Sequence, residues 1–215
     1  MNIPIKGISI SRTDSAIHVE SAAPLVTLSS AIVGGGYGRT RHILNFHVDK
    51  DFNSNNPRAW LRSNARERNI DEPFIGLLTA VKLRKARIVF LERDGLWAAS
   101  IITAGTGNAT AAGISLPFPQ QPGTINIILL LGARLTRPAM LNAVITATEV
   151  KTATLREKNI LTPEGNTATG TSTDTVTVAC ARQGISQPYA GPATTIGWLI
   201  ARAVRQSLEK ALSAP

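Results

Sequence analysis

Hydrophobic residues alternate with polar ones in some stretches of the chain and recur every three to four residues in others, so both strands and helices are expected. Alternation, or a short apolar run bounded by Gly, Pro, Asn or Ser, predicts strands. The predicted strands cover residues 3–10, 17–20, 25–33, 41–49, 87–91, 96–103, 124–131 and 173–181. Residues 74–81 fit a strand and a helix equally well.

Helical periodicity marks residues 57–69, 137–158 and 195–212. Asn56 is a typical N-cap and Pro57 a typical first helical residue. Strands and helices are mixed without strict alternation, and no linker or long repeat divides the chain. We therefore expect one domain over residues 1–215, of the α/β or α+β class, with mixed β-sheets layered against helices. One side of the second helix carries residues at amphipathic spacing, namely Leu141, Val144, Ile145, Thr148, Thr152 and Leu155.

Composition supports a soluble folded domain. Hydrophobic residues make up 43% of the chain, enough to bury a core. No apolar run reaches the ~20 residues of a membrane helix, and residues 1–15 lack the layout of a signal peptide. Cys180 is the single cysteine, which excludes an internal disulfide, and we interpret it as a small buried hydrophobe. These features predict a cytoplasmic protein.

The net charge of +9 raises the question of a nucleic-acid partner. No aromatic residues are interleaved with the basic clusters, and no helix-turn-helix, zinc-finger or RNP pattern is present. We therefore expect no nucleic-acid partner, with RNA binding as the weakest alternative, and interpret the clusters as a solvated helix face and a charged turn. The clusters comprise Arg58, Arg62 and Arg66, and Lys82, Arg84, Lys85 and Arg87.

Known cofactor and metal patterns are not met. Gly105 and Gly107 follow a predicted strand, but Thr110 occupies the position where a dinucleotide fingerprint needs its third glycine. The three histidines and Cys180 lack the spacing of a zinc site. We expect no metal, and the sequence assigns no oligomeric state.

Four polar or small residues stand out at the ends or in the middle of apolar elements. Asn126 lies inside an apolar strand, where its amide needs either a structural hydrogen bond or a ligand. Gly123 allows close backbone approach, and Thr124 offers a hydroxyl nucleophile or donor. Glu149 lies in the second helix among small and hydroxyl side chains, which leaves room for a ligand.

Threonine occupies every odd position from Thr167 to Thr177, and Asp174 is the only acid of this run. Glycine and proline upstream favour a loop before about residue 173. Asp174 would then lie at the mouth of a buried strand and share a face with Val176 and Val178. A carboxylate in this position is a candidate for a functional site.

Six stretches in order along the chain resemble the adenosylcobinamide amidohydrolase family. They are residues 29–48, 102–113, "GTINIILLL" at 123–131, 147–155, "ATGTSTDTVTVAC" at 168–180 and 189–204, and the resemblance spans roughly residues 25–212. It implies hydrolysis of the aminopropanol amide of adenosylcobinamide to adenosylcobyric acid and 1-amino-2-propanol, with no cofactor required and the corrinoid as substrate. The alternative is a corrinoid-binding protein without catalysis. Because the corrinoid is itself cationic, the charge of +9 is assigned no role in substrate binding.

Within that resemblance we expect one cleft with catalytic and binding residues. Asp174 or Glu149 would be the general base, and Thr124 or water the nucleophile. Asn108 and backbone N–H groups near Gly105 and Gly123 would receive the oxyanion. The predicted substrate-binding residues are Asn45, Gly105, Asn108, Gly123 and Asn126. The segment after Gly123 also resembles, faintly, self-processing aminopeptidases of the β-aminopeptidyl type, which suggests layered sheets and helices.

Overall fold

The computed structural model describes residues 5–71, 73–118, 123–181 and 184–213. One eight-stranded mixed sheet has the order β4-β3-β2-β11-β8-β6-β5, with β1 beside β2. Its main strands are β1 (Ile8–Arg12), β2 (Ala16–Ser29), β3 (Gly36–His47), β4 (Phe74–Thr79), β5 (Arg87–Arg93), β6 (Leu96–Ala104), β8 (Ile125–Leu131) and β11 (Thr175–Cys180). Short two-stranded sheets pair β7 (Ala109–Thr110) with β10 (Gly170–Thr171) and β9 (Arg134–Leu135) with β12 (Ser186–Gln187).

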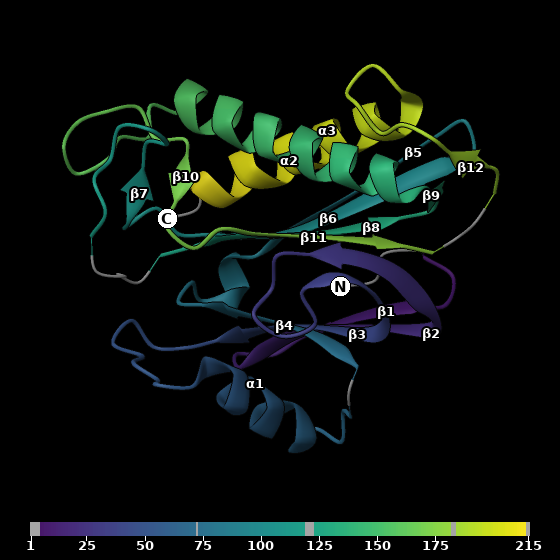
Figure 1. Ribbon diagram of the computed structural model, residues 1–215, viewed down its shortest axis with the longest axis horizontal. Helices are drawn as coiled ribbons and strands as arrows, with labels where there is room; N and C mark the ends of the chain where they lie inside the picture. Colours follow the sequence, from purple (N-terminus) through teal and green to yellow (C-terminus); the bar gives the residue numbers. More distant parts are fainter. Residues whose placement is uncertain (1–4, 72, 119–122, 182–183, 214–215) are drawn as a thin grey trace.

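The sheet bends back on itself, so that helices and strands form four layers (Figure 1). Helices α2 (Arg137–Glu157) and α3 (Thr195–Leu212) cover the half made of β5, β6, β8 and β11. The half made of β1 to β4 lies beneath it, and α1 (Pro57–Arg66) covers the far side. A one-turn helix, η1 (Leu83–Lys85), leads into β5. The prediction of one domain with mixed sheets layered against helices is confirmed in fold class.

Three hydrophobic cores fill the spaces between the layers. One joins α2 and α3 to the upper half-sheet, and it includes Ile127, Leu129 and Leu199. A second lies between the half-sheets, where Ile43 and Ile128 meet. The third packs α1 against β3 and β4. Alternate residues of β8 therefore enter different cores, which explains why this strand is apolar at nearly every position.

Strand β2 corrects the prediction of two separate strands at residues 17–20 and 25–33. It is one strand of 14 residues, and its pairing with β3 shifts register between Glu20 and Leu25. Its last residues pair with β11 in the upper half-sheet. Strand β3 likewise begins at Gly36, earlier than predicted, and residues 74–79 are a strand.

Helix boundaries follow local signals closely. Asn56 caps α1 by accepting a hydrogen bond of 3.0 Å from the Ala59 backbone N–H. The helix ends at Arg66 rather than at residue 69, because Asn69 adopts a positive φ of 56° and turns the chain. The bounds of α2 and α3 match the predicted 137–158 and 195–212 to within one residue.

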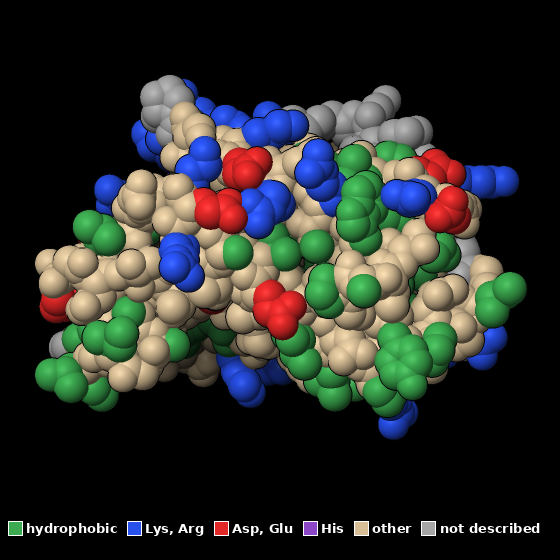
Figure 2. All heavy atoms as spheres, turned by 90° about the horizontal axis from the view of Figure 1, so that it is seen from above, with side chains coloured by type: hydrophobic (Ala, Val, Ile, Leu, Met, Phe, Trp, Pro, Cys, Tyr) green, Lys and Arg blue, Asp and Glu red, His purple; other side chains and the backbone are tan. Residues whose placement is uncertain are grey.

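The amphipathic side predicted for α2 is wrong. Leu141 and Ile145 are 57% and 53% exposed. The face that packs against α3 and β11 carries small residues, because short side chains let the helix approach closely. Its buried residues are Ala139, Met140, Ala143, Thr146, Ala147, Lys151, Thr154 and Leu155. From above the helices, charged and hydrophobic side chains are interspersed (Figure 2). Among the residues described, no helix is long and apolar enough to cross a membrane.

Candidate active site

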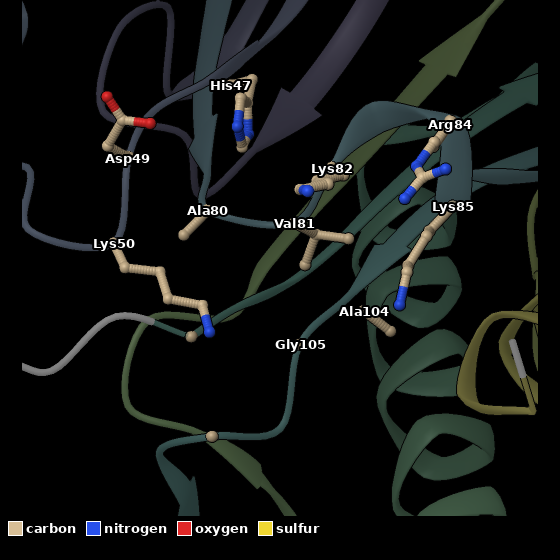
Figure 3. Close-up of a pocket in the computed structure, with 12 residues that line it drawn as sticks. His47, Asp49, Lys50, Ala80, Val81, Lys82, Arg84, Lys85, Ala104 and Gly105 are labelled. Atoms are coloured by element: carbon tan, nitrogen blue, oxygen red, sulfur yellow. The ribbon is translucent and has the colours of Figure 1, made fainter. Parts of the chain in front are cut away.

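A cavity of about 650 Å³ lies where β3, β4 and β6 end and the segment leading into β8 begins. Figure 3 shows how its lining comes from segments that are far apart in the sequence. The walls combine small residues with charged ones. The lining residues are His47, Asp49, Lys50, Ala80, Val81, Lys82, Arg84, Lys85, Ala104, Gly105, Gly107 and Gly123. Of the predicted site residues, Gly105 and Gly123 therefore lie directly on the cavity.

Asn45 and Asn126 form a neutral cluster that joins the two half-sheets near this cavity. The Asn126 amide Nδ2 donates to Asn45 Oδ1 at 3.0 Å and to the Leu78 carbonyl at 2.8 Å. Asn45 Nδ2 donates in turn to Thr103 Oγ1 at 3.1 Å. Both asparagines are 1% exposed. Of the two roles open for Asn126, the structure provides the structural hydrogen bond, and a role of Asn45 and Asn126 in substrate binding stays a prediction.

Thr124 lies between the cavity and β8. Its hydroxyl is placed to donate to the Thr173 carbonyl at 2.9 Å or to Asn126 Oδ1 at 3.2 Å. The Thr124 carbonyl accepts from the Gly105 N–H at 3.0 Å. That N–H, predicted as an oxyanion donor, is thus already engaged. Thr124 is buried, while Gly123 beside it faces the cavity.

Asp174, directly before β11, is held by four donors. Its Oδ1 accepts from the Ile125 N–H at 3.0 Å and from the Thr171 hydroxyl. Its Oδ2 accepts from the Thr171 N–H at 3.1 Å and from Lys151 Nζ, with which it forms an ion pair. The carboxylate therefore fixes the start of β8, the β10 turn and helix α2 to one another. This agrees with the predicted position at the mouth of a buried strand.

Lys151 is the site residue that the sequence analysis missed. The side chains of Lys151 and Asp174 are 10% and 12% exposed, so the pair is nearly shielded from water. Gly170 leaves room for it, because a Cβ there would lie 2.5 Å from Asp174 Oδ2 and 2.6 Å from Lys151 Nζ. The available signal was the row of small residues at four-residue spacing, Ala143 and Ala147, which continues to Lys151.

Asn108 packs against Gly123 and explains the glycine there. A Cβ on Gly123, whose φ is +153°, would lie 2.1 Å from Asn108 Oδ1. Asn108 Nδ2 donates to Ser172 Oγ at 2.8 Å, next to the Asp174 turn. The structure thus brings Asn108, Gly123, Thr124 and Asp174 into one neighbourhood.

Glu149 lies apart from this neighbourhood. It is exposed on α2, whereas Lys151, two residues further, turns toward Asp174. Residues two positions apart on a helix do not share a face, so the side chains of Glu149 and Lys151 point to different sides of α2. Asp174 lies in the neighbourhood of Gly123 and Thr124, whereas Glu149 does not, and the role of either residue as a base stays a prediction.

The histidines and the cysteine considered as functional candidates contact other protein groups or are buried in the core. His18 Nε2 and His42 Nδ1 are 3.0 Å apart on neighbouring strands. Cys180 is buried, as predicted, and burial raises the pKa of its thiol to about 12. Within the described part of the chain, no three His, Cys, Asp or Glu side chains are grouped so as to hold a metal ion.

Comparison with known proteins decides the family. The family model of CbiZ, adenosylcobinamide amidohydrolase, matches residues 1–215. The chain belongs to this family. Its activity is accordingly that of an adenosylcobinamide amidohydrolase, a hydrolase of corrinoid salvage in cobalamin biosynthesis, as the sequence predicted.

Two members of this family and one solved structure are similar to the chain. The adenosylcobinamide amidohydrolase of Methanosarcina mazei is 36% identical over 84% of this chain and 86% of its own length. That of Halobacterium salinarum is 36% identical over 63% of this chain and 57% of its own length. Among solved structures, a Burkholderia sp. beta-aminopeptidase is similar at 12% identity, with a TM-score of 0.49 over 96% of this chain and 83% of that chain.

Proposed function

We propose that the adenosylcobinamide amidohydrolase uses the cavity beside Gly123 to hydrolyse the amide between the corrin propionyl arm and aminopropanol. The products are adenosylcobyric acid and 1-amino-2-propanol. One observation carries this assignment: Asp174, tied to Lys151, holds the backbone of Ile125 directly after Thr124. A buried hydroxyl directly after the cavity-lining Gly123, with a carboxylate network behind it, supplies the groups that acyl transfer needs.

The reaction adds an oxygen nucleophile to the amide carbon. This oxygen belongs either to Thr124 or to a water molecule. The tetrahedral oxyanion then collapses, the C–N bond breaks, and the nitrogen of the leaving aminopropanol takes the proton that the base removed from the nucleophile. If Thr124 attacks, an acyl ester forms first and water hydrolyses it in a second step. The Asn108 amide, packed on Gly123, is a candidate donor to the oxyanion.

Asp174 is our preferred acid–base and orienting group. Its Oδ1 accepts a hydrogen bond from the Thr171 hydroxyl, which supports a role as acceptor for a hydroxyl donor at this turn. Lys151 keeps the carboxylate oriented, because the ion pair is nearly buried and its geometry is constrained from three segments.

Turnover of adenosylcobinamide by purified variants tests this assignment. We expect Asp174→Asn and Thr124→Ala each to lower kcat/KM at least ~10²-fold, and Glu149→Gln to remain within a few-fold of the parent. Cobyric acid is measured by chromatography, and circular dichroism confirms folding. Near-normal turnover of folded Asp174→Asn, with loss in Glu149→Gln, would reverse the assignment of the base.

Thr124→Ser separates the two nucleophiles. If Thr124 attacks, serine preserves turnover while alanine abolishes it, and an acyl-enzyme adduct is trapped by mass spectrometry. If water attacks, alanine retains substantial turnover.

The corrinoid is the proposed partner, with no required cofactor and no nucleic acid. Full activity after dialysis against a chelator supports the absence of a required cofactor. Loss of activity that a metal ion restores contradicts it. The single cysteine, Cys180, allows no internal disulfide, which supports the proposal of a cytoplasmic location. Binding of adenosylcobinamide without formation of cobyric acid would instead indicate a non-catalytic corrinoid-binding protein.

A further inference from the structure

Four basic side chains line the cavity. Lys50 follows β3, whereas Lys82, Arg84 and Lys85 belong to the segment around η1. In Figure 3, Arg84 and Lys85 lie on one side of the opening and Lys50 on the other. Asp49 is the only acidic residue among the lining residues. Within the described chain, none of the four cations forms an ion pair.

This concentration of charge does not match the corrinoid as such. Adenosylcobinamide has neutral amide arms and a cationic metal centre, so a cationic wall repels it. Two unit charges 4 Å apart interact by about 1 kcal/mol in water and about 4 kcal/mol near a protein surface. An anion in the cavity would therefore be attracted by all four cations.

A second observation at the same cavity also indicates an occupant. His47, the last residue of β3, lines the cavity, and its Nδ1 is buried without a hydrogen-bond partner in the described structure. A buried polar atom normally has a partner, because leaving it unpaired costs about 1–3 kcal/mol. A ligand with acceptor oxygens would accept a hydrogen bond from an N–H at Nδ1 and would bind the neighbouring cations at the same time.

We propose that this cavity contains a subsite for a phosphate-type anion, bound by Lys50, Lys82, Arg84 and Lys85. The proposal rests on the proposed function in that the same cavity takes the substrate. Lysine and arginine are the usual phosphate-binding side chains, arginine through its planar fork and lysine as a point charge. The cavity is also larger than aminopropanol requires. Aminopropanol has five heavy atoms, and each occupies roughly 20–30 Å³ on the scale of liquid water, where one molecule takes about 30 Å³. Together they fill only a fraction of the 650 Å³ of the cavity.

The phosphate-type group has two possible sources. It is either free inorganic phosphate or pyrophosphate, or a phosphate ester on the aminopropanol hydroxyl of the corrinoid. Both present the same oxygens to the cations, and the experiment separates them.

Anion binding is measured first, without turnover. Pyrophosphate is titrated into the full chain by calorimetry at low ionic strength. We expect Lys82→Gln/Lys85→Gln to weaken the Kd at least tenfold, and Arg58→Gln, which removes one exposed cation of α1 that does not line the cavity, to leave it unchanged. Absence of binding by the parent chain, or equal weakening in both variants, overturns the proposal.

Kinetics with two substrates identifies the source. If the ester is the ligand, the O-phosphate of adenosylcobinamide has a lower KM than adenosylcobinamide, and Lys82→Gln/Lys85→Gln removes this difference. If the free anion is the ligand, pyrophosphate changes the KM of adenosylcobinamide and the variant abolishes that effect. When the variant alters neither, the subsite is refuted. Asp174→Asn separates this from failure of the proposed function, because it should lose turnover and still bind pyrophosphate.

Discussion

Two buried polar clusters near the cavity differ in charge and in what they connect. The asparagine cluster, Asn45 with Asn126, is neutral and links one half-sheet to the other. The aspartate cluster, Asp174 with Lys151, is charged and links the upper half-sheet to helix α2. Neutral amides can satisfy each other completely inside a protein, whereas a buried ion pair depends on both partners being present. The first cluster is suited to holding the architecture, and the second is suited to controlling a reaction.

Removing one partner of the ion pair should have the largest effect on stability. Asp174→Asn leaves the ammonium of Lys151 buried without a carboxylate, and we expect a loss of about 3–5 kcal/mol in the free energy of unfolding. Lys151→Met should cost less, because Asp174 retains its bonds to Ile125 and Thr171. Urea unfolding followed by circular dichroism measures both.

The double variant Lys151→Met/Asp174→Asn supplies the control. It should be more stable than Asp174→Asn alone, since no uncompensated charge remains. If the single and double variants are equally stable, the ion pair does not behave as a buried one, and the contrast between the clusters disappears.

The asparagine cluster should give a smaller effect, and on stability alone. Asn126→Leu removes the donor to Asn45 and to the Leu78 carbonyl, so we expect a loss of about 1–3 kcal/mol. Turnover per folded molecule should stay within a few-fold of the parent. A large rise in KM at unchanged stability would instead support the predicted role of Asn126 in substrate binding.

The smallest effect concerns His18, outside both clusters. Burial, and then the neighbouring His42, lower the pKa of His18 below its usual 6.5. The unfolded chain therefore binds a proton more readily than the folded protein as the pH falls below about 6.5, and stability decreases there. His18→Gln should make the unfolding free energy less dependent on pH between 7.0 and 5.5. An unchanged slope in denaturation at the two pH values would exclude His18 as its source.

Local sequence signals located most elements but not the contacts between them. The bounds of α3 follow from its periodicity, and the N-cap of α1 from Asn56. The buried face of α2 was missed because small residues give little hydrophobic pattern, although they pack most closely. The continuity of β2 was also missed, since its bend depends on pairing with partners in both half-sheets.

The sequence predicted the candidate-site residues that lie in loops but not the one that lies on a helix. Asp174, Thr124, Gly123 and Asn108 come from loops next to apolar strands, where polar residues are conspicuous in sequence. Lys151 was missed because lysine is almost never fully buried without a partner, and its partner lies 23 residues away. The sequence could not show that Glu149 is exposed and Lys151 is buried, because this depends on which face of α2 packs against the sheet.

Strand β2, shared by both half-sheets, has a consequence for how the molecule can open. One continuous backbone crosses from the lower layer to the upper, so neither layer is a separable folding unit. The layers cannot hinge apart unless β2 loses its pairing with β3 or with β11, and this loss would end the cooperative unfolding of the whole domain. We therefore expect a bulky corrinoid to present one arm to the cavity at the strand ends, with most of its ring outside the protein.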